Sequence, residues 1–175
     1  MTCIVAIRNK ENVIMGGDSL GSNYYNKVVR TDPKVFKKDN FVIGYTRSFR
    51  MGQILRHKIK LEVPKKDPDE YMFNLCNLLI KEFEELKFLE EVNKVAKGGV
   101  FLIAWENHLY EIQENFQYAR VKDNYTSVGA GEAFALGSLY TTEKMEDRKT
   151  RILLALNAAS KFSTSVGKPY IFRST

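Results

Sequence analysis

The chain contains few of the residues that build disulfide frameworks or metal sites. Its 175 positions include two cysteines and two histidines. Cys3 and Cys76 are too few for a disulfide framework and favour a reducing compartment. His57 and His108 have no partners at ligand spacing, so we expect no metal site. No apolar run approaches the roughly 18 residues of a membrane span, and no basic segment leads into one near Met1. These absences predict a cytoplasmic protein without a membrane contact.

Signals for nucleotides and nucleic acids are missing as well. Gly129-Ala130-Gly131 lacks the third glycine and the following acid of a dinucleotide-binding turn, and no ATP-binding loop is present. The net charge is +6, but the lysines and arginines are scattered instead of forming one stripe with aromatic residues. We therefore expect no nucleic acid and no cofactor. Length and ordinary composition predict a single domain over residues 1–175.

The pattern of apolar residues predicts two blocks of strands and two pairs of helices. The first block follows β-branched runs and polar turns, with a loop over residues 18–25. Its expected strands are 3–8, 12–17, 27–31, 34–37 and 41–45. Helical spacing then predicts helices over residues 48–61 and 67–89, the second with Asp67 as its N-cap.

The second half repeats this order. Its expected strands are 100–105, 109–112, 116–121 and 125–128, its helices 133–139 and 151–159, and its closing strand 169–173, with the first strand pair joined by a turn at Asn107-His108. Grouped strands and grouped helices favour antiparallel sheets over an alternating parallel sheet. The predicted fold is α+β, a four-layer αββα sandwich of two antiparallel sheets.

The first residues carry the chemistry. Because the side chain of Thr2 is small, we expect Met1 to be removed, which leaves a hydroxyl nucleophile and a free α-amine on one residue. Gly16-Gly17-Asp18-Ser19 and then Lys34-Val35 follow, and this ordering suggests an enzyme. Each also has an ordinary interpretation: Thr2 as a strand residue, Asp18 as a turn former and Lys34 as a solvated lysine. Cys3 is expected to point to the opposite face of the strand from Thr2.

These motifs resemble the proteasome β-subunit and HslV-like family of N-terminal threonine peptidases. The resemblance lies in Thr2-x-Ile4-Val5-x-Ile7, Gly17-Asp18-Ser19 and Lys34-Val35, and extends to Val42-Ile43-Gly44-Tyr45 and the turn Ser127-Val128-Gly129-Ala130-Gly131. It implies the fold of the N-terminal nucleophile hydrolases, which is the αββα sandwich. It also implies a threonine-type endopeptidase subunit of a self-compartmentalised protease.

The resemblance assigns roles to individual residues. Thr2 is the implied nucleophile, Lys34 the charge beside it, and Asp18 the partner that fixes Lys34. The backbone N–H of Arg47 is the implied oxyanion donor, because only the amide is needed where the family has glycine. Ser22 lies where the family aligns the substrate backbone as an added strand.

Two positions depart from the family pattern. Ala130 stands where the family has a serine that orients the α-amine, and Lys161 stands where the family has an acid, beside Ser160 and Ser163. Two alternatives therefore stay open: a non-catalytic structural subunit and an N-terminal nucleophile amidohydrolase for small amides. The implied partners are other copies of the chain in a homo-oligomeric ring, unfolded polypeptide as substrate, and an AAA+ unfoldase ATPase.

Overall fold

The computed structural model describes residues 2–22, 26–65 and 67–175. Met1, whose removal is expected, and residues 23–25 of the expected loop lie outside the described residues. Within the described ranges, no helix is both long enough and apolar enough to span a bilayer.

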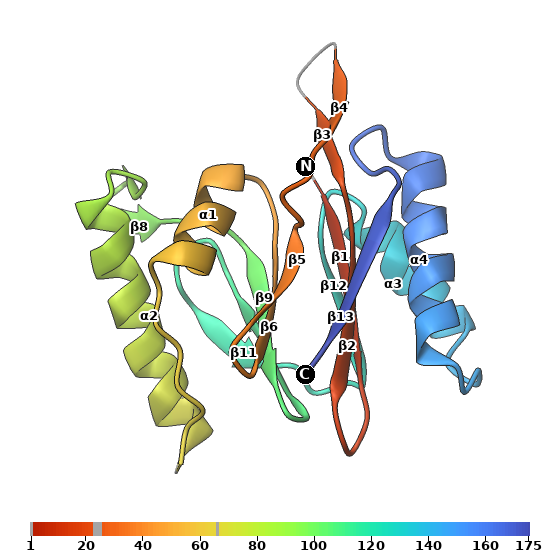
Figure 1. Ribbon diagram of the computed structural model, residues 1–175, viewed down its shortest axis with the longest axis horizontal. Helices are drawn as coiled ribbons and strands as arrows, with labels where there is room; N and C mark the ends of the chain where they lie inside the picture. The colour runs from red at the N-terminus through yellow and green to blue at the C-terminus, as the bar shows by residue number, and fades with distance from the viewer. Residues whose placement is uncertain (1, 23–25, 66) are drawn as a thin grey trace.

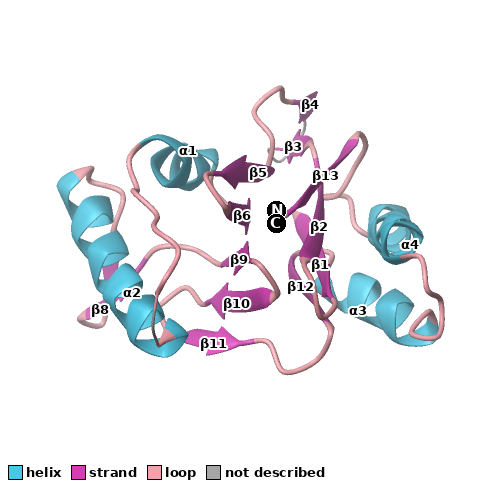
Figure 2. Ribbon diagram, turned by 60° about the horizontal axis from the view of Figure 1, so that its bottom comes forward, coloured by secondary structure: helices cyan, strands magenta, loops and turns pink. Residues whose placement is uncertain are grey.

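Two antiparallel sheets pack face to face between two helical layers (Figures 1 and 2). The first sheet contains, in spatial order, β12 (Tyr125–Gly129), β1 (Cys3–Arg8), β2 (Val13–Asp18) and β13 (Tyr170–Ser174). The second contains β11 (Tyr118–Arg120), β10 (His108–Ile112), β9 (Phe101–Trp105), β6 (Phe41–Tyr45) and β5 (Val35–Lys38). The helices α3 (Glu132–Thr141) and α4 (Arg148–Phe162) cover the first sheet, and α1 (Phe49–His57) and α2 (Pro68–Glu85) cover the second. The predicted four-layer αββα sandwich is confirmed.

The alternation of side chains along β1 explains why the first sheet is buried on both faces. Cys3, Val5 and Ile7 pack with apolar residues of α3 and α4. Ile4 and Ala6 point the other way and pack with the second sheet. Successive strand side chains alternate between faces, so an unbroken apolar run is what a central layer requires.

The predicted helices were too long at their C-terminal ends. α1 ends at His57 rather than residue 61, and α2 ends at Glu85 rather than residue 89. Just beyond the Leu86 C-cap, Lys87 has a φ of 53°, in the left-handed region that ends a helix. The predicted N-cap is confirmed, because the Asp67 side chain accepts a hydrogen bond from the backbone N–H of Asp69 at 2.9 Å.

The expected loop at residues 18–25 contains a strand that the sequence did not predict. β3 (Leu20–Ser22) pairs with β4 (Lys27–Val29), and the hairpin projects beyond the sheets at the top of Figure 1. A second small hairpin, β7 (Glu90–Val92) with β8 (Val95–Lys97), was also missed. Both lack apolar alternation, so only the pairing of their backbones makes them strands.

The turn between β9 and β10 lies one residue earlier than predicted. Glu106 and Asn107 form it, with Glu106 at a φ of 48°, and His108 is already the first residue of β10. The imidazole of His108 stacks on the indole of Trp105, with 5.1 Å between ring centroids. This contact with the aromatic core draws His108 into the strand.

Candidate active site

Thr2 lies directly before β1 and forms part of the wall of a pocket of about 470 Å³. The residue itself is 2% exposed. The other lining residues come from both sheets and the segments that follow them: Thr46, Arg47, Val100, Glu111, Gln113, Glu114, Gly129, Ala130 and Glu132. A threonine at the wall of a pocket of this size can meet a bound side chain or a peptide segment.

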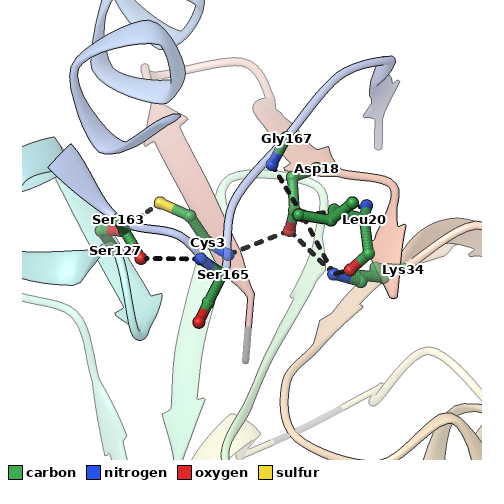
Figure 3. A network of polar contacts seen from close by, with 8 residues as sticks. All are labelled: Cys3, Asp18, Leu20, Lys34, Ser127, Ser163, Ser165 and Gly167. Carbon is green, nitrogen blue, oxygen red and sulfur yellow. Dashed lines mark hydrogen bonds and ion pairs between the residues drawn. The ribbon is translucent and has the colours of Figure 1, made fainter. Parts of the chain in front are cut away.

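Asp18 and Lys34 form a buried ion pair (Figure 3). Asp18 is the last residue of β2 and Lys34 directly precedes β5, so the pair links the two sheets. The ammonium nitrogen of Lys34 lies 3.0 Å from each carboxylate oxygen of Asp18 and donates to the Leu20 carbonyl at 2.7 Å. Asp18 is fully buried and Lys34 is 1% exposed. Burial lowers the pKa of Lys34, and the charge of Asp18 opposes this shift.

The Asp18 carboxylate also organises the backbone next to Thr2. It accepts from the N–H of Cys3 at 3.1 Å, of Leu20 at 3.0 Å and of Gly167 at 3.3 Å. The Gly167 contact brings the loop between α4 and β13 to the pair, as Figure 3 shows. Since Cys3 follows Thr2 in the chain, the carboxylate fixes where the backbone of Thr2 enters β1.

The glycine turn after β12 touches the backbone of Thr2. The Gly131 N–H donates to the Thr2 carbonyl at 3.3 Å. Gly129 has a φ of 105°, and a Cβ added there would lie 2.4 Å from the same carbonyl oxygen. Only glycine fits this approach. Ala130, the next residue, lines the pocket without a hydroxyl group.

Arg47 places an N–H donor at the pocket. Its φ of 64° lies in the left-handed region, which is uncommon for a residue with a side chain. No hydrogen bond among the described residues uses the Arg47 backbone N–H as donor. The guanidinium group instead forms an ion pair with Glu114. Thr46 supports the turn, since its N–H and hydroxyl donate to the Val100 carbonyl at 3.1 and 2.8 Å.

Cys3 faces away from the pocket, as the alternation of the strand predicted. Its thiol contacts the Ser127 hydroxyl at 3.6 Å within the cluster beneath α3 and α4. Burial raises the pKa of the Cys3 thiol to about 12. A thiol that stays protonated and buried is not a nucleophile.

Two residues singled out from the sequence lie apart from this pocket. Ser22 ends β3, is not among the residues that line the Thr2 pocket, and its buried hydroxyl has no hydrogen-bond partner among the described residues. Lys161 lies exposed in the last turn of α4, and it lines a different pocket of about 340 Å³. Ser163 follows it and accepts from the N–H of Ser165 at 3.3 Å.

Several lining residues were not predicted from the sequence. Glu111 on β10 and Glu132 at the start of α3 are far from Thr2 in the chain, and no motif marks them. Thr46 carried a weak signal, because it directly precedes the expected oxyanion donor. No group of three or more His, Cys, Asp or Glu side chains in the described ranges is arranged to hold a metal ion.

No family model and no curated protein sequence matches the chain. Several solved structures, however, resemble it closely in three dimensions. Thiobacillus denitrificans BPH superposes with a TM-score of 0.85 at 19% identity, over 99% of this chain and 97% of that one. A second structure of BPH, in complex with epoxomicin, gives 0.84 at 18% identity, with the same coverage of both chains. Eukaryotic HslV from Trypanosoma brucei gives 0.73 at 14% identity, over 98% of each chain.

The chain therefore has the proteasome β-subunit and HslV-like fold of the N-terminal nucleophile hydrolases. The likeness covers nearly the whole length of each of these chains. At these identities it establishes the fold, and the chemistry has to be argued from the site itself.

Proposed function

We propose that this chain is a threonine-type endopeptidase subunit of a self-compartmentalised, proteasome-like protease that degrades unfolded cytoplasmic protein. The observation that carries the proposal is the position of Thr2. It lines a pocket together with the unpartnered N–H of Arg47, and the buried Asp18–Lys34 pair holds the backbone next to it. A nucleophile, a fixed positive charge and an oxyanion donor are the parts that acyl transfer requires.

The mechanism begins with removal of Met1. The free α-amine of Thr2, directly or through a water molecule, accepts the hydroxyl proton while the side-chain oxygen bonds to the substrate carbonyl carbon. The Arg47 N–H stabilises the resulting oxyanion, and the charge of Lys34 favours the alkoxide character of Thr2. The protonated amine then gives its proton to the leaving amine as the peptide bond breaks. Water hydrolyses the threonine ester in the reverse sequence and restores the free hydroxyl.

Assembly into a homo-oligomeric ring belongs to the same proposal. An exposed apolar surface on the outer helices supports it, because large side chains there contact water in the single chain. This surface, the α3–α4 face, consists of Phe134, Tyr140, Leu153, Leu154 and Phe162. We assign it to a second copy of the chain. A closed ring would admit only unfolded polypeptide, and therefore requires an AAA+ unfoldase ATPase as partner.

One observation favours a second candidate, a non-catalytic structural subunit. Ala130 contributes no hydroxyl group to the pocket, and Lys161 lines a different pocket from Thr2. Two groups that help the threonine in the family therefore have no counterpart at these positions. The two candidates differ in one measurable property, which is whether Thr2 reacts.

The test compares four proteins by their hydrolysis of a quenched fluorogenic peptide and by their intact mass. The processed wild type should lack Met1 and cleave the peptide, whereas Thr2→Ala should lose at least about 100-fold in rate. A form with an uncleavable N-terminal extension keeps every side chain and converts only the amine to a peptide nitrogen, and it should be equally inactive. Thr2→Ser, which keeps a hydroxyl, is the positive control. Equal rates for the wild type and Thr2→Ala would contradict the N-terminal threonine mechanism, and the structural subunit would become the better explanation.

Epoxomicin provides an independent readout. Because a structure of BPH contains this compound, we expect it to bind the processed wild type and to raise its melting temperature. Thr2→Ala should show a smaller shift. An equal shift in both proteins would place the compound away from Thr2.

A further inference from the structure

The Thr2 pocket has an unusual distribution of charge. Three glutamates line it, and they come from separate parts of the fold: Glu111 from β10, Glu114 from the turn after β10, and Glu132 from the first position of α3. Glu111 belongs to the second sheet, whereas Glu132 belongs to the helical layer that covers the first sheet. An inner sheet and an outer helical layer thus bring carboxylates to one cavity.

The pocket holds fewer cations than carboxylates. Arg47 is its only positively charged lining residue among those described, and its guanidinium group pairs with Glu114. Lys97 also approaches Glu114, with 3.6 Å between nitrogen and oxygen. None of the ion pairs in the described ranges includes Glu111 or Glu132. No described side chain therefore supplies a compensating cation to these two carboxylates.

The surroundings of both carboxylates penalise their negative charge. The pKa of Glu111 is raised by burial and further by the charge of Glu132. Glu132 is an exposed residue, but partial burial of its carboxyl group raises its pKa, and a hydrogen bond from the Gly129 backbone opposes this shift. A bound cation would relieve the repulsion and compensate for the lost hydration. Gln113 donates to the Glu111 carboxylate and holds one of its oxygens in place.

We propose that this pocket is a specificity site that binds a lysine or arginine side chain of the substrate, next to the scissile bond. The inference rests on the proposed function, since Thr2 as nucleophile defines where that bond lies. The cavity of about 470 Å³ has room for a long side chain, and it also contains Thr2 and the free N–H of Arg47. A guanidinium group can donate to two carboxylates at once and brings a positive charge to them, whereas an uncharged side chain of the same shape brings no charge.

Citrulline offers the matched comparison, because it has nearly the shape of arginine but no charge. Binding of argininamide and citrullinamide to the assembled wild type is measured by isothermal titration calorimetry. Argininamide should bind about tenfold more tightly, as expected for hydrogen bonds to charged groups. This comparison requires no variant and no catalytic activity. Equal affinity, or no binding of either amide, would overturn the inference.

Variants then locate the effect. Glu111→Gln and Glu132→Gln should each reduce the argininamide preference, and the double variant should bring the two affinities close together. Glu84→Gln, on the exposed side of α2, is the control and should keep the wild-type preference. An undiminished preference in a folded double variant would show that the cation binds elsewhere.

Hydrolysis separates this inference from the proposed function. In one pair of peptides the residue before the scissile bond is arginine or citrulline, and in a second pair the residue after it is. In one of the two pairs, kcat/KM should be higher for the arginine peptide than for the citrulline peptide. Cleavage with equal kcat/KM for arginine and citrulline in both pairs would contradict the specificity site but would leave the proposed peptidase activity intact. Preferential argininamide binding without cleavage of any peptide would contradict the peptidase and leave the cation site intact.

Discussion

The Lys34 ammonium nitrogen lies 3.0 Å from both carboxylate oxygens of Asp18, and neither residue is more than 1% exposed. The two charges come from different sheets, and the same carboxylate also accepts from the backbone N–H of Cys3. The pair therefore serves two purposes at one point: it closes the sandwich and it positions the residue that follows Thr2.

Removal of one charge and then of both should separate these two purposes. Lys34→Met leaves the Asp18 carboxylate buried without its cation, which should lower the free energy of unfolding by about 3–5 kcal/mol. Peptide hydrolysis should be lost as well. The double variant Asp18→Asn with Lys34→Met removes both charges, so we expect stability to recover in urea denaturation while hydrolysis stays absent. Recovery of hydrolysis in the double variant would show that the charge of Lys34 has no part in the reaction.

Gly129→Ala should displace Thr2. The added Cβ would lie 2.4 Å from the Thr2 carbonyl oxygen, and alanine disfavours the φ of 105°. A displacement of about 1 Å at a nucleophile can reduce the rate by about 100-fold. Gly137→Ala is the control: Gly137 lies within α3, and a Cβ there meets no atom within 4 Å. It should stabilise the protein by about 0.5–1 kcal/mol, because alanine favours a helix. Equal hydrolysis in both variants would contradict the close contact at Thr2.

Both thiols should be inert in the folded protein. Burial raises the pKa of Cys3 to about 12 and that of Cys76 to about 11, so the reactive thiolate is scarce at neutral pH. A colorimetric thiol reagent should therefore label no cysteine before unfolding and two after denaturation, matching the two in the sequence. Rapid labelling of Cys3 in the native protein would contradict the protonated, buried state of its thiol.

Stability should fall in alkaline solution. Burial raises the pKa of Cys3 from 9.0 to about 12, and raises Tyr45 and Tyr71 from 10.0 to about 12. Each group is neutral when protonated, so the folded state holds its proton more tightly than the unfolded state. Their stabilising contribution is complete below pH 9.0 and is lost as the pH rises toward about 12. Urea midpoints measured across this range should decrease, and the decrease should be smaller for Tyr45→Phe.

The α3–α4 face should control assembly. Phe162 is 67% exposed and packs against Phe134 with the two rings tilted, at 5.4 Å between ring centroids. Phe162→Ser should therefore reduce the mass of the assembly measured by light scattering after size exclusion. Phe73→Ser, which removes an exposed phenylalanine of α2 on the opposite outer layer, should leave that mass unchanged. A monomeric wild type at micromolar concentration would contradict the ring.

The fold was predictable because its signals are local. The apolar run of β1 and the N-cap Asp67 each act within a few residues, so the order of strands and helices follows from the sequence. The strand predicted over residues 27–31 corresponds to β4, whereas β3, β7 and β8 were missed because each is only three residues long and shows no apolar alternation.

The candidate site divides in the same way. The sequence by itself proposed Thr2, Asp18 and Lys34 as site residues, because they stand in a short N-terminal motif with characteristic spacing. It could not show that Asp18 accepts the Gly167 N–H, or that Glu111 and Glu132 share the pocket of Thr2. Those contacts join positions separated by more than a hundred residues, and they exist only once the two sheets have packed together. Local patterns therefore determined the secondary-structure elements and pointed to Thr2 as the candidate nucleophile, whereas packing between the layers decided which charged side chains line the pocket.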